Sequence, residues 1–393
     1  MKKYILIAAF GLALAACQDG SVKVHVANDS KLDRKAGLVL LDAGQLKDRL
    51  GSDYLYVTDA DGVEIPSQLT SDGRLLFAAD IAAGTESTFT VAASDSARVY
   101  KSLVSGRIYP ERADDVAWEN ELIGFRAYGP ATQRKGERAY GYDIFFKHPT
   151  EDQILEVLYG AECDPAAWHR VDSLRAIDPA LGNAYRESFS YHVDHGLGMD
   201  CYAVGPTLGA GVAVPVVNDS LSFAWCYDKA VVTDNGPLRF EVRLDFAPRA
   251  IGSDTAVTEH RIITLDAGRH LNTTRVWYDG LTAPVTMAAG VPLRDDSPVF
   301  TDASKGILAY CDPTQGADNG RAMLGVVMSS AADSIIEKQG HIVALTELAP
   351  ADTLDYSWGF AWDRADITAP EAWHQYLINY AREQAEPLRV TIE

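Results

Sequence analysis

Hydrophobic and polar residues alternate in short runs along most of the chain, a pattern typical of β-strands with one buried face. In the first hundred residues these runs are separated by turn sequences, Asp-Ala-Asp-Gly at 59–62 and Ser-Asp-Gly at 71–73. The clearest runs of this region are 22–26, 54–57, 75–77 and 87–91. They predict a small antiparallel β-sandwich over residues 18–100, which residues 94–105 join to a second region.

From residue 101 onward the strand signals continue at longer spacing, for example at 123–128, 238–244 and 274–278. One face of the second of these runs is apolar throughout: Leu238, Phe240, Val242 and Leu244. We therefore expect a larger β domain of supersandwich type over residues 101–393, and an all-β layered fold for the chain. Residues 151–184 are less regular and predict either a helical excursion or a long loop.

One helix is predicted near the C-terminus, over residues 369–384. Thr368 and Glu371 match a capping box, and Pro370 suits the first helical turn. The apolar residues that follow at helical spacing are Trp373, Leu377, Tyr380 and Ala381. This pattern predicts a helix that covers a sheet, with Trp373 in a structural role.

The N-terminus predicts export. Residues 1–3 contain two lysines, residues 4–16 form an apolar run too short to span a bilayer comfortably, and residues 14–17 read Leu-Ala-Ala-Cys. A cysteine directly after small residues is typical of a bacterial lipoprotein, in which Cys17 is acylated and becomes the new N-terminus. An ordinary cleaved signal peptide is the alternative. We expect a body anchored by lipid to the outer membrane of a Gram-negative bacterium, on its periplasmic or surface side.

The net charge of the chain limits the classes of partner that it can bind. Loss of Lys2 and Lys3 with the signal peptide changes the formal net charge from -20 to -22. Such an acidic body repels nucleic acid and anionic membrane faces, so we expect no nucleic-acid partner and membrane contact through the lipid anchor only. An anionic substrate would need a local positive pocket.

Five cysteines occur in the chain, and four remain once Cys17 is lipidated. These are Cys163, Cys201, Cys226 and Cys311. An exported compartment permits disulfides, but no CxxC motif occurs and the spacings are wide. Two bridges, one bridge or none are all compatible with the sequence.

Residues 191–202 (Tyr-His-Val-Asp-His-Gly-Leu-Gly-Met-Asp-Cys-Tyr), here called the histidine block, are the densest group of ionisable side chains. They hold two of the nine histidines of the chain. The candidate site residues within the block are His192, Asp194, His195, Asp200 and Tyr202. Groups that move protons or bind a cation are crowded here, so the block is a better candidate for a site than for core.

Two arginines on predicted strands are candidates for binding a carboxylate. Arg126 follows Glu119 and Asn120 closely in sequence and could form a bidentate pair with a substrate carboxylate. Pairing of Arg126 with Glu119 or Glu121 is an equally weighted alternative. Arg239 follows a Gly-Pro turn and lies on the polar face of its strand.

Three aromatic residues alternate on one strand face: Trp358, Phe360 and Trp362. They could stack on sugar rings, but a buried core face is the favoured interpretation. Residues 265–272 indicate a turn rather than a site.

Several of these motifs together resemble a known family. The motifs are WENE (118–121), IGFRAYGP (123–130), GYDIFF (141–146), YHVDHGLGMDCYAVGPTLG (191–209), NGPLRFEV (235–242), WGFAWD (358–363) and EAWHQY (371–376). In order and content they are similar to domain-of-unknown-function family 4861, secreted lipoproteins of polysaccharide-degrading bacteria. The resemblance implies a galactose-mutarotase-like supersandwich and, for some members, dehydration of an oligosaccharide at a terminal uronic acid. Phenylalanine stands at a position of GYDIFF where the family has tryptophan, which leaves the site untouched.

The residues fit this reaction. Elimination of water from a glucuronate removes the proton at C5, next to the carboxylate, and the hydroxyl at C4. Arg126 or Arg239 would stabilise the developing charge, and His192 is the first choice of base. Tyr202 or His195 would protonate the leaving hydroxyl. The remaining candidates, which would bind or orient the substrate, are Asp194, Asp200, Glu119 and Asn120. No cofactor is required.

Three other functions stay open. His192, His195 and Asp200 could instead bind a divalent metal ion. The protein could be a glycan-binding lipoprotein without catalytic activity. It could also be a glycoside hydrolase, which needs two carboxylates flanking the bond, and Glu119 with Asp194 or Asp200 could serve.

Overall fold

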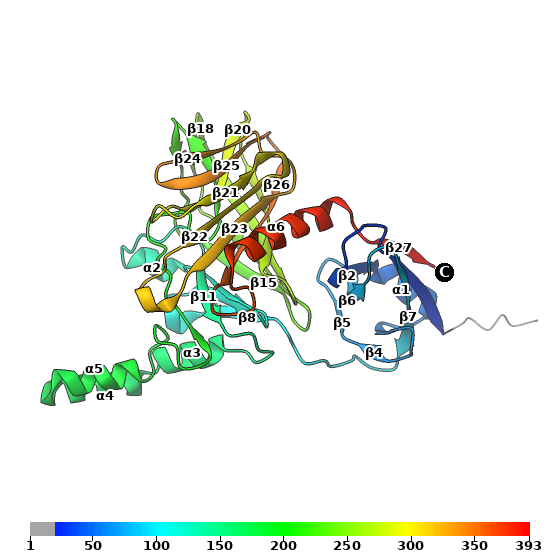
Figure 1. Ribbon diagram of the computed structural model, residues 1–393, viewed down its shortest axis with the longest axis horizontal. Coiled ribbons are helices and arrows are strands. Elements are labelled where there is room, and N and C mark those ends of the chain that lie inside the picture. Colours follow the sequence, from blue (N-terminus) through cyan, green and yellow to red (C-terminus); the bar gives the residue numbers. More distant parts are fainter. Residues whose placement is uncertain (1–19) are drawn as a thin grey trace, which may run out of the picture.

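The computed structural model describes residues 20–393, so the expected signal peptide and Cys17 lie outside the described residues. Figure 1 shows a small body at the right, which holds the first strands, and a large β body at the left, with helix α6 running between them. Within residues 20–393, no helix has both the length and the apolar character needed to cross a membrane.

The small body is a β-sandwich of a five-stranded sheet, ordered β27-β1-β7-β3-β4, and a three-stranded sheet, ordered β2-β6-β5. Its strands are β1 Ser21–Ala27, β2 Arg34–Asp42, β3 Tyr54–Thr58, β4 Glu64–Ile65, β5 Ser67–Leu69, β6 Arg74–Ile81, β7 Glu86–Ser94 and β27 Arg389–Ile392. Alternating side chains such as Val24, Val57 and Phe77 form its core. Helix α1 (Ala43–Leu50) begins after Asp42, whose side chain accepts a hydrogen bond from the Gln45 N–H.

The last strand of the chain completes this N-terminal body. β27 pairs antiparallel with β1, with Ile392 opposite Val24. The ion pair of Arg34 with Glu383 adds a contact between β2 and α6. The sequence pattern did not predict this return, because the two strands that pair are more than 350 residues apart.

The large body contains three antiparallel sheets, ordered β12-β11-β10-β9-β8, β14-β13-β20-β25-β24 and β15-β16-β18-β19-β26-β23-β22-β21, with β17 paired to β18. The strands of the first two are β8 Ser105–Tyr109, β9 Asp115–Glu119, β10 Gly124–Ala127, β11 Asp143–Lys147, β12 Gly198–Met199, β13 Ala213–Val217, β14 Ser220–Leu221, β20 Val285–Pro292, β24 Ser334–Lys338 and β25 His341–Leu348. Those of the third are β15 Lys229–Asn235, β16 Arg239–Asp245, β17 Arg249–Ile251, β18 Asp254–Asp266, β19 Leu271–Asp279, β21 Val299–Asp302, β22 Ile307–Asp312, β23 Ala322–Met328 and β26 Thr353–Trp362. The predicted all-β fold is confirmed.

Aromatic side chains fill the centre of the large body. Trp358 stacks on Tyr142 at 4.1 Å between ring centroids and meets Phe125 edge-on at 5.1 Å. Trp358, Phe360 and Trp362 are all buried, at most 2% exposed. These tryptophans are therefore core, as the favoured interpretation held, and their rings are not available to stack on a sugar.

The excursion between β11 and β12 is helical. It consists of α3 (Leu155–Glu162), α4 (Pro165–Ile177) and α5 (Pro179–Glu187), and Asp164 and Asp178 cap the last two. The shorter helical segments are η1 Pro110–Arg112, α2 Pro130–Arg134, η2 Ala303–Lys305 and η3 Ala317–Asn319. In Figure 1, α4 and α5 extend beyond α3, away from the sheets.

The predicted C-terminal helix is α6, Pro370–Ala385. Its buried residues Trp373, Leu377 and Tyr380 pack on the outer face of β22 and β23, which confirms a helix covering a sheet. The predicted capping box is wrong. Ala369, in an extended conformation, occupies the N-cap position, and no side chain caps the helix. The proline explains this, because it fixes the helix start at residue 370 and favours extended backbone at the residue before it.

Candidate acid/base site

The histidine block follows α5 and forms a loop at the edge of the first sheet of the large body. The Asp200 N–H donates to the Tyr191 carbonyl at 2.8 Å and closes the loop. Within it, β12 pairs with β11, and Met199 lies opposite Phe146. Gly198 has φ +131°, and a Cβ at this position would lie 1.9 Å from the Phe146 carbonyl oxygen. Only glycine fits there, so the backbone of the block is held close to β11.

His192 presents one ring nitrogen in a defined state. Its Nδ1 lies 2.8 Å from the backbone carbonyl oxygen of Asp200. Because a carbonyl oxygen can only accept, Nδ1 carries the hydrogen, and in the neutral ring Nε2 holds the free lone pair. The His192 side chain is 45% exposed. The loop thus holds an imidazole in the tautomer and exposure that a general base requires.

Asp200 supports His192 from beneath. Its carboxylate is buried, lies 3.9 Å from Nδ1 of His192 and accepts a hydrogen bond from Arg126 at 2.9 Å. Its Oδ1 has no hydrogen-bond partner among residues 20–393. Burial, reinforced by the charge of Asp143, raises the pKa of Asp200 to about 6. This carboxyl group therefore titrates near neutral pH, next to the imidazole.

Arg126 is buried in a network of ion pairs and is not exposed to bind a substrate. It lies opposite Asp143 in the register of β10 and β11 and forms ion pairs with Asp143 and Asp200. The Tyr128 hydroxyl donates to Asp143 at 2.6 Å. Arg126 is only 3% exposed. Arg126 therefore pairs with carboxylates of the protein and not, as expected, with a substrate carboxylate. Its partners also differ from Glu119 and Glu121, the alternative that the sequence left open.

Arg112, at the end of η1, is the cation of the site that the sequence did not reveal. Its Nε donates to the Tyr191 hydroxyl at 3.1 Å, and Arg126 donates to the same hydroxyl at 3.4 Å. The Tyr191 ring in turn meets the His192 ring edge-on at 4.6 Å between centroids. Arg112 is 29% exposed, and its one recorded carboxylate contact is with Asp115 at 4.0 Å. It is therefore a partly exposed cation that contacts Tyr191, the neighbour of His192. No motif marks it, because it is a single arginine in a short turn.

Asp194 and His195 lie at the outer side of the block. Asp194 pairs with His148 at 2.8 Å and accepts hydrogen bonds from the backbone N–H groups of Gly196 and Gly198. Partial burial opposes ionisation, but these hydrogen bonds hold the pKa of Asp194 below its usual value. His195 is exposed. Over residues 20–393, no three His, Cys, Asp or Glu side chains are grouped as a metal site would require, and His192, His195 and Asp200 form no such group.

Tyr202 lies in the main core rather than on the surface. It is 3% exposed, and its hydroxyl has no hydrogen-bond partner among the described residues. Arg294 lies over its ring at 5.0 Å. Burial raises the pKa of Tyr202, so the hydroxyl stays protonated. Burial separates Tyr202 from solvent, so of the two expected acids only His195 is accessible.

Glu119 and Asn120 have structural partners. Glu119 accepts from Lys147 at 2.8 Å and from the N–H groups of Ile154 and Leu155, and both members of the ion pair are buried. Asn120 donates to two backbone carbonyls and accepts from two N–H groups, which satisfies all its hydrogen-bonding positions. Neither side chain is available to a substrate. Glu119 therefore cannot be one of the two carboxylates that the hydrolase alternative requires.

Arg239 lies at the contact between the two bodies. It forms a bidentate pair with Asp266, at 2.6 and 3.0 Å, directly across β16 and β18. Gln68 of the small body accepts from the Arg239 N–H at 2.8 Å. The structure therefore does not bring Arg239 together with the histidine block. The carboxylate of Asp266, on the neighbouring strand, binds Arg239 where a substrate carboxylate was expected.

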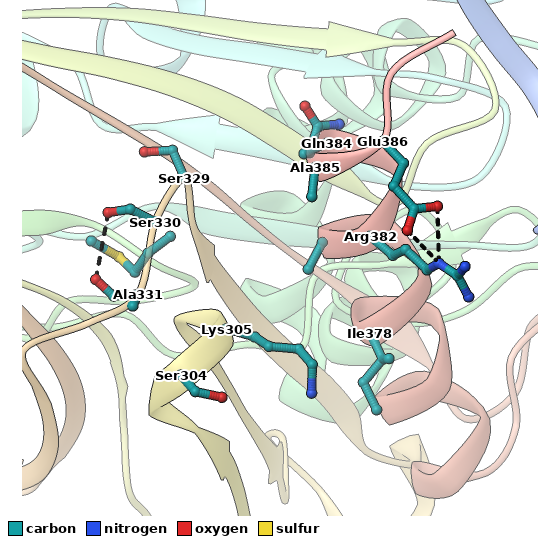
Figure 2. Close-up of a pocket in the computed structure, with 12 residues that line it drawn as sticks. Ser304, Lys305, Ser329, Ser330, Ala331, Ile378, Arg382, Gln384, Ala385 and Glu386 are labelled. Carbon is teal, nitrogen blue, oxygen red and sulfur yellow. Dashed lines mark hydrogen bonds and ion pairs between the residues drawn. The ribbon is translucent and has the colours of Figure 1, made fainter. Parts of the chain in front are cut away.

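Two further features are the state of the cysteines and a cavity. Cys163, Cys201, Cys226 and Cys311 are free thiols. A cavity of about 570 Å³ lies between α6 and the segment that follows β23 (Figure 2). Its charged side chains pair within the protein, Lys305 with Asp302 and Arg382 with Glu386. No residue of the histidine block lines it.

Fold and site together define a two-body antiparallel β protein with a histidine–carboxylate site at a sheet edge. A sequence model of the family described as Domain of unknown function (DUF4861) matches residues 26–390. The chain belongs to this family, and the resemblance stated from its motifs is confirmed.

Among curated proteins, the chain is 24% identical over 327 residues to Uncharacterized protein P7 of Formosa agariphila, covering 81% of this chain and 78% of that protein. Among solved structures, a glycosyl hydrolase family 38 protein from Enterococcus faecalis has a TM-score of 0.51 and 7% identity, covering 95% of this chain and 48% of that one. An alpha-mannosidase from the same organism has a TM-score of 0.49 and 8% identity, with coverage of 95% and 46%. The chain spans about half the length of both solved proteins, and the likeness concerns the fold alone.

Proposed function

We propose that the protein is a carbohydrate-active lyase that eliminates water from the terminal uronic acid of an acidic oligosaccharide, with His192 as the base. The observation that carries this proposal is the hydrogen bond from His192 Nδ1 to the Asp200 carbonyl, which leaves Nε2 free. The fold likeness to a glycosyl hydrolase family 38 protein supports carbohydrate as the substrate class.

In this mechanism His192 Nε2 takes the C5 proton of the uronate. The electron pair of the C5–H bond forms a C4=C5 double bond, and the C4–O bond breaks. His195, the exposed acid of the loop, gives its proton to the departing hydroxyl, which leaves as water. Arg112 pairs with the substrate carboxylate and stabilises the negative charge that develops on it. The net change is the loss of one water and no cleavage of the sugar chain.

Asp200 is a positioning residue in this scheme. Its carbonyl fixes the imidazole tautomer, and its carboxylate, 3.9 Å from Nδ1, stabilises the imidazolium that forms when Nε2 takes a proton. Arg126 holds that carboxylate in place from the buried side. Acid/base chemistry of this kind uses side chains of the protein alone.

The test is a product analysis with a panel of oligosaccharides that end in glucuronate or another uronic acid. We expect a product lighter by one water, with a new ultraviolet absorbance and no new reducing end. A new reducing end without the absorbance would indicate hydrolysis and would overturn the proposal. Binding without turnover across the panel would favour a glycan-binding lipoprotein.

We further propose that the mature protein is lipid-anchored through Cys17 at the outer membrane. The support is the Leu-Ala-Ala-Cys sequence at residues 14–17. Labelling of cells with a fatty acid tests this directly. Label should enter the wild-type protein and not the Cys17→Ser variant, and equal labelling of both would contradict lipidation at this residue.

A further inference from the structure

The helical hairpin α4–α5 carries an aromatic and arginine cluster at its base. The two helices pack on each other, and their only buried residues are Val171 and Gly182. Figure 1 shows the hairpin projecting from the large body. The first turn of α4 and the last turn of α5 lie at the end of the hairpin that joins the body, and the histidine block follows α5 along the chain.

Three aromatic rings gather at this base. Phe189 meets Trp168 at 5.9 Å and Tyr185 at 5.6 Å between ring centroids, both with inclined planes. All three side chains are half-buried. Rings of this kind offer apolar faces beside polar edges, which suits the mixed faces of a pyranose ring.

Two arginines lie over these rings. Arg170 lies 5.3 Å from the Tyr185 ring centroid, and Arg186 lies 5.7 Å from that of Trp168. Neither forms an ion pair with a carboxylate among residues 20–393, although the chain has 55 acidic residues and 35 Lys and Arg. Aromatic rings thus hold two cations in place without neutralising them, which leaves the guanidinium groups able to bind an anion.

The cluster is continuous with the candidate site. The N–H groups of Phe189 and Ser190 both donate to the Arg186 carbonyl, so the end of α5 continues tightly into the histidine block. Phe189 precedes His192 by three residues, which limits their Cα separation to about 11 Å. A chain of sugars with one end at His192 would therefore reach the cluster.

We propose that Trp168, Tyr185, Phe189, Arg170 and Arg186 form a subsite for the acidic sugars that follow the reacting terminal residue. The rings stack on sugar faces, and the two guanidinium groups pair with carboxylate or sulfate groups. This inference rests on the proposed function for the identity of its ligand. Its basis is the charge complementarity of two unneutralised arginines with an acidic chain, and the limit of about 11 Å between the Cα atoms of Phe189 and His192.

The experiment compares binding of oligoglucuronates of two and six residues by calorimetry. All variants also carry His192→Ala, so that the ligand stays intact. For the six-residue ligand we expect Arg170→Ala with Arg186→Ala to weaken binding by about tenfold or more, and Trp168→Ala to weaken it as well. Binding of the two-residue ligand should not change. The control is Arg175→Ala, which removes one positive charge from the same hairpin outside the cluster, where Arg175 contacts Asn183.

The outcomes separate this inference from the proposed function. If the cluster variants bind the six-residue ligand as tightly as Arg175→Ala does, the subsite is overturned. The subsite is also overturned if the parent protein, which carries only His192→Ala, does not bind the six-residue ligand. It is overturned as well if the cluster variants change their oligomeric state rather than their affinity for this ligand. If the cluster variants lose the tighter binding of the six-residue ligand and the protein with His192 intact never dehydrates that ligand, the result supports the subsite and overturns only the lyase. Thermal unfolding of each variant verifies that the hairpin is folded.

Discussion

His192 donates through Nδ1 to the backbone carbonyl of Asp200 at 2.8 Å, while the carboxylate of the same residue lies 3.9 Å away. One residue thus fixes the orientation of the imidazole and places a buried acid beneath it. This relationship gives the loop a defined chemistry, because the free Nε2 lone pair can take a proton and the carboxylate can stabilise the resulting charge.

Asp200 should give the fold a characteristic pH dependence. The pKa of its folded-state carboxyl group is raised to about 6, above the ordinary value of 3.8. The stabilisation that the protonated form provides is complete below about pH 4 and is lost as the pH rises through about 6. The size is about 1–3 kcal/mol. Urea unfolding at pH 4.5 and pH 7 should show this change in the wild-type protein and a smaller one in Asp200→Asn. Equal changes in both would contradict the assignment.

Arg112→Ala should impair substrate use and leave the fold intact. The side chain is partly exposed and has only a 4.0 Å contact with a carboxylate, so its removal breaks no close ion pair. In the proposed reaction it binds the substrate carboxylate, and we expect kcat/KM to fall by about tenfold or more. Arg134→Ala is the control, because Arg134 forms an exposed pair with Asp114 at 2.8 Å. Unchanged kinetics in Arg112→Ala would remove this arginine from the site.

Arg126→Ala should destabilise the protein strongly. Its removal leaves the buried carboxylates of Asp143 and Asp200 without their shared cation, which costs about 3–5 kcal/mol. Arg134→Ala, which breaks only a surface pair, should change the free energy of unfolding by less than about 1 kcal/mol. Chemical unfolding of the three proteins measures this difference. A loss in Arg126→Ala no larger than that in Arg134→Ala would show that the buried network contributes little.

Glu119→Gln should lower the stability of the protein without lowering the activity of the folded molecule. The carboxylate is buried against Lys147 and two backbone N–H groups, so the variant should lose about 3 kcal/mol or more of stability. The rate per folded molecule should remain close to that of the wild-type protein. Activity normalised to the folded fraction measures this rate. A large loss of activity in fully folded protein would restore Glu119 as a catalytic carboxylate.

Local patterns were enough to predict strands such as β1, β10 and β19, the covering helix and the loop that holds the candidate site. Alternation placed Phe240 and Val242 on the buried face of β16, and the density of ionisable groups singled out His192 and Asp200. The helices α4 and α5 could also have been predicted, since Asp164-Pro165 and Asp178-Pro179 are helix start signals.

Pairings across the sheets could not be predicted from these patterns. Arg126 and Arg239 each face a carboxylate on the neighbouring strand, Asp143 and Asp266, and strand register is a property of the fold rather than of a local segment. The return of β27 to β1 is equally non-local. Arg112 was missed for the same reason, because its place in the site depends on Tyr191, which lies far along the chain.

The rate of water loss, followed by mass spectrometry, tests whether His192 is the base of a dehydration. Wild-type, His192→Ala and His25→Ala proteins are compared on the same uronate-terminated oligosaccharide, with His25 lying in the small sandwich. We predict that His192→Ala folds normally and is slower by about 10²–10⁴-fold, and that His25→Ala matches the wild-type protein. Water loss by His192→Ala at the wild-type rate would show that His192 is not the base.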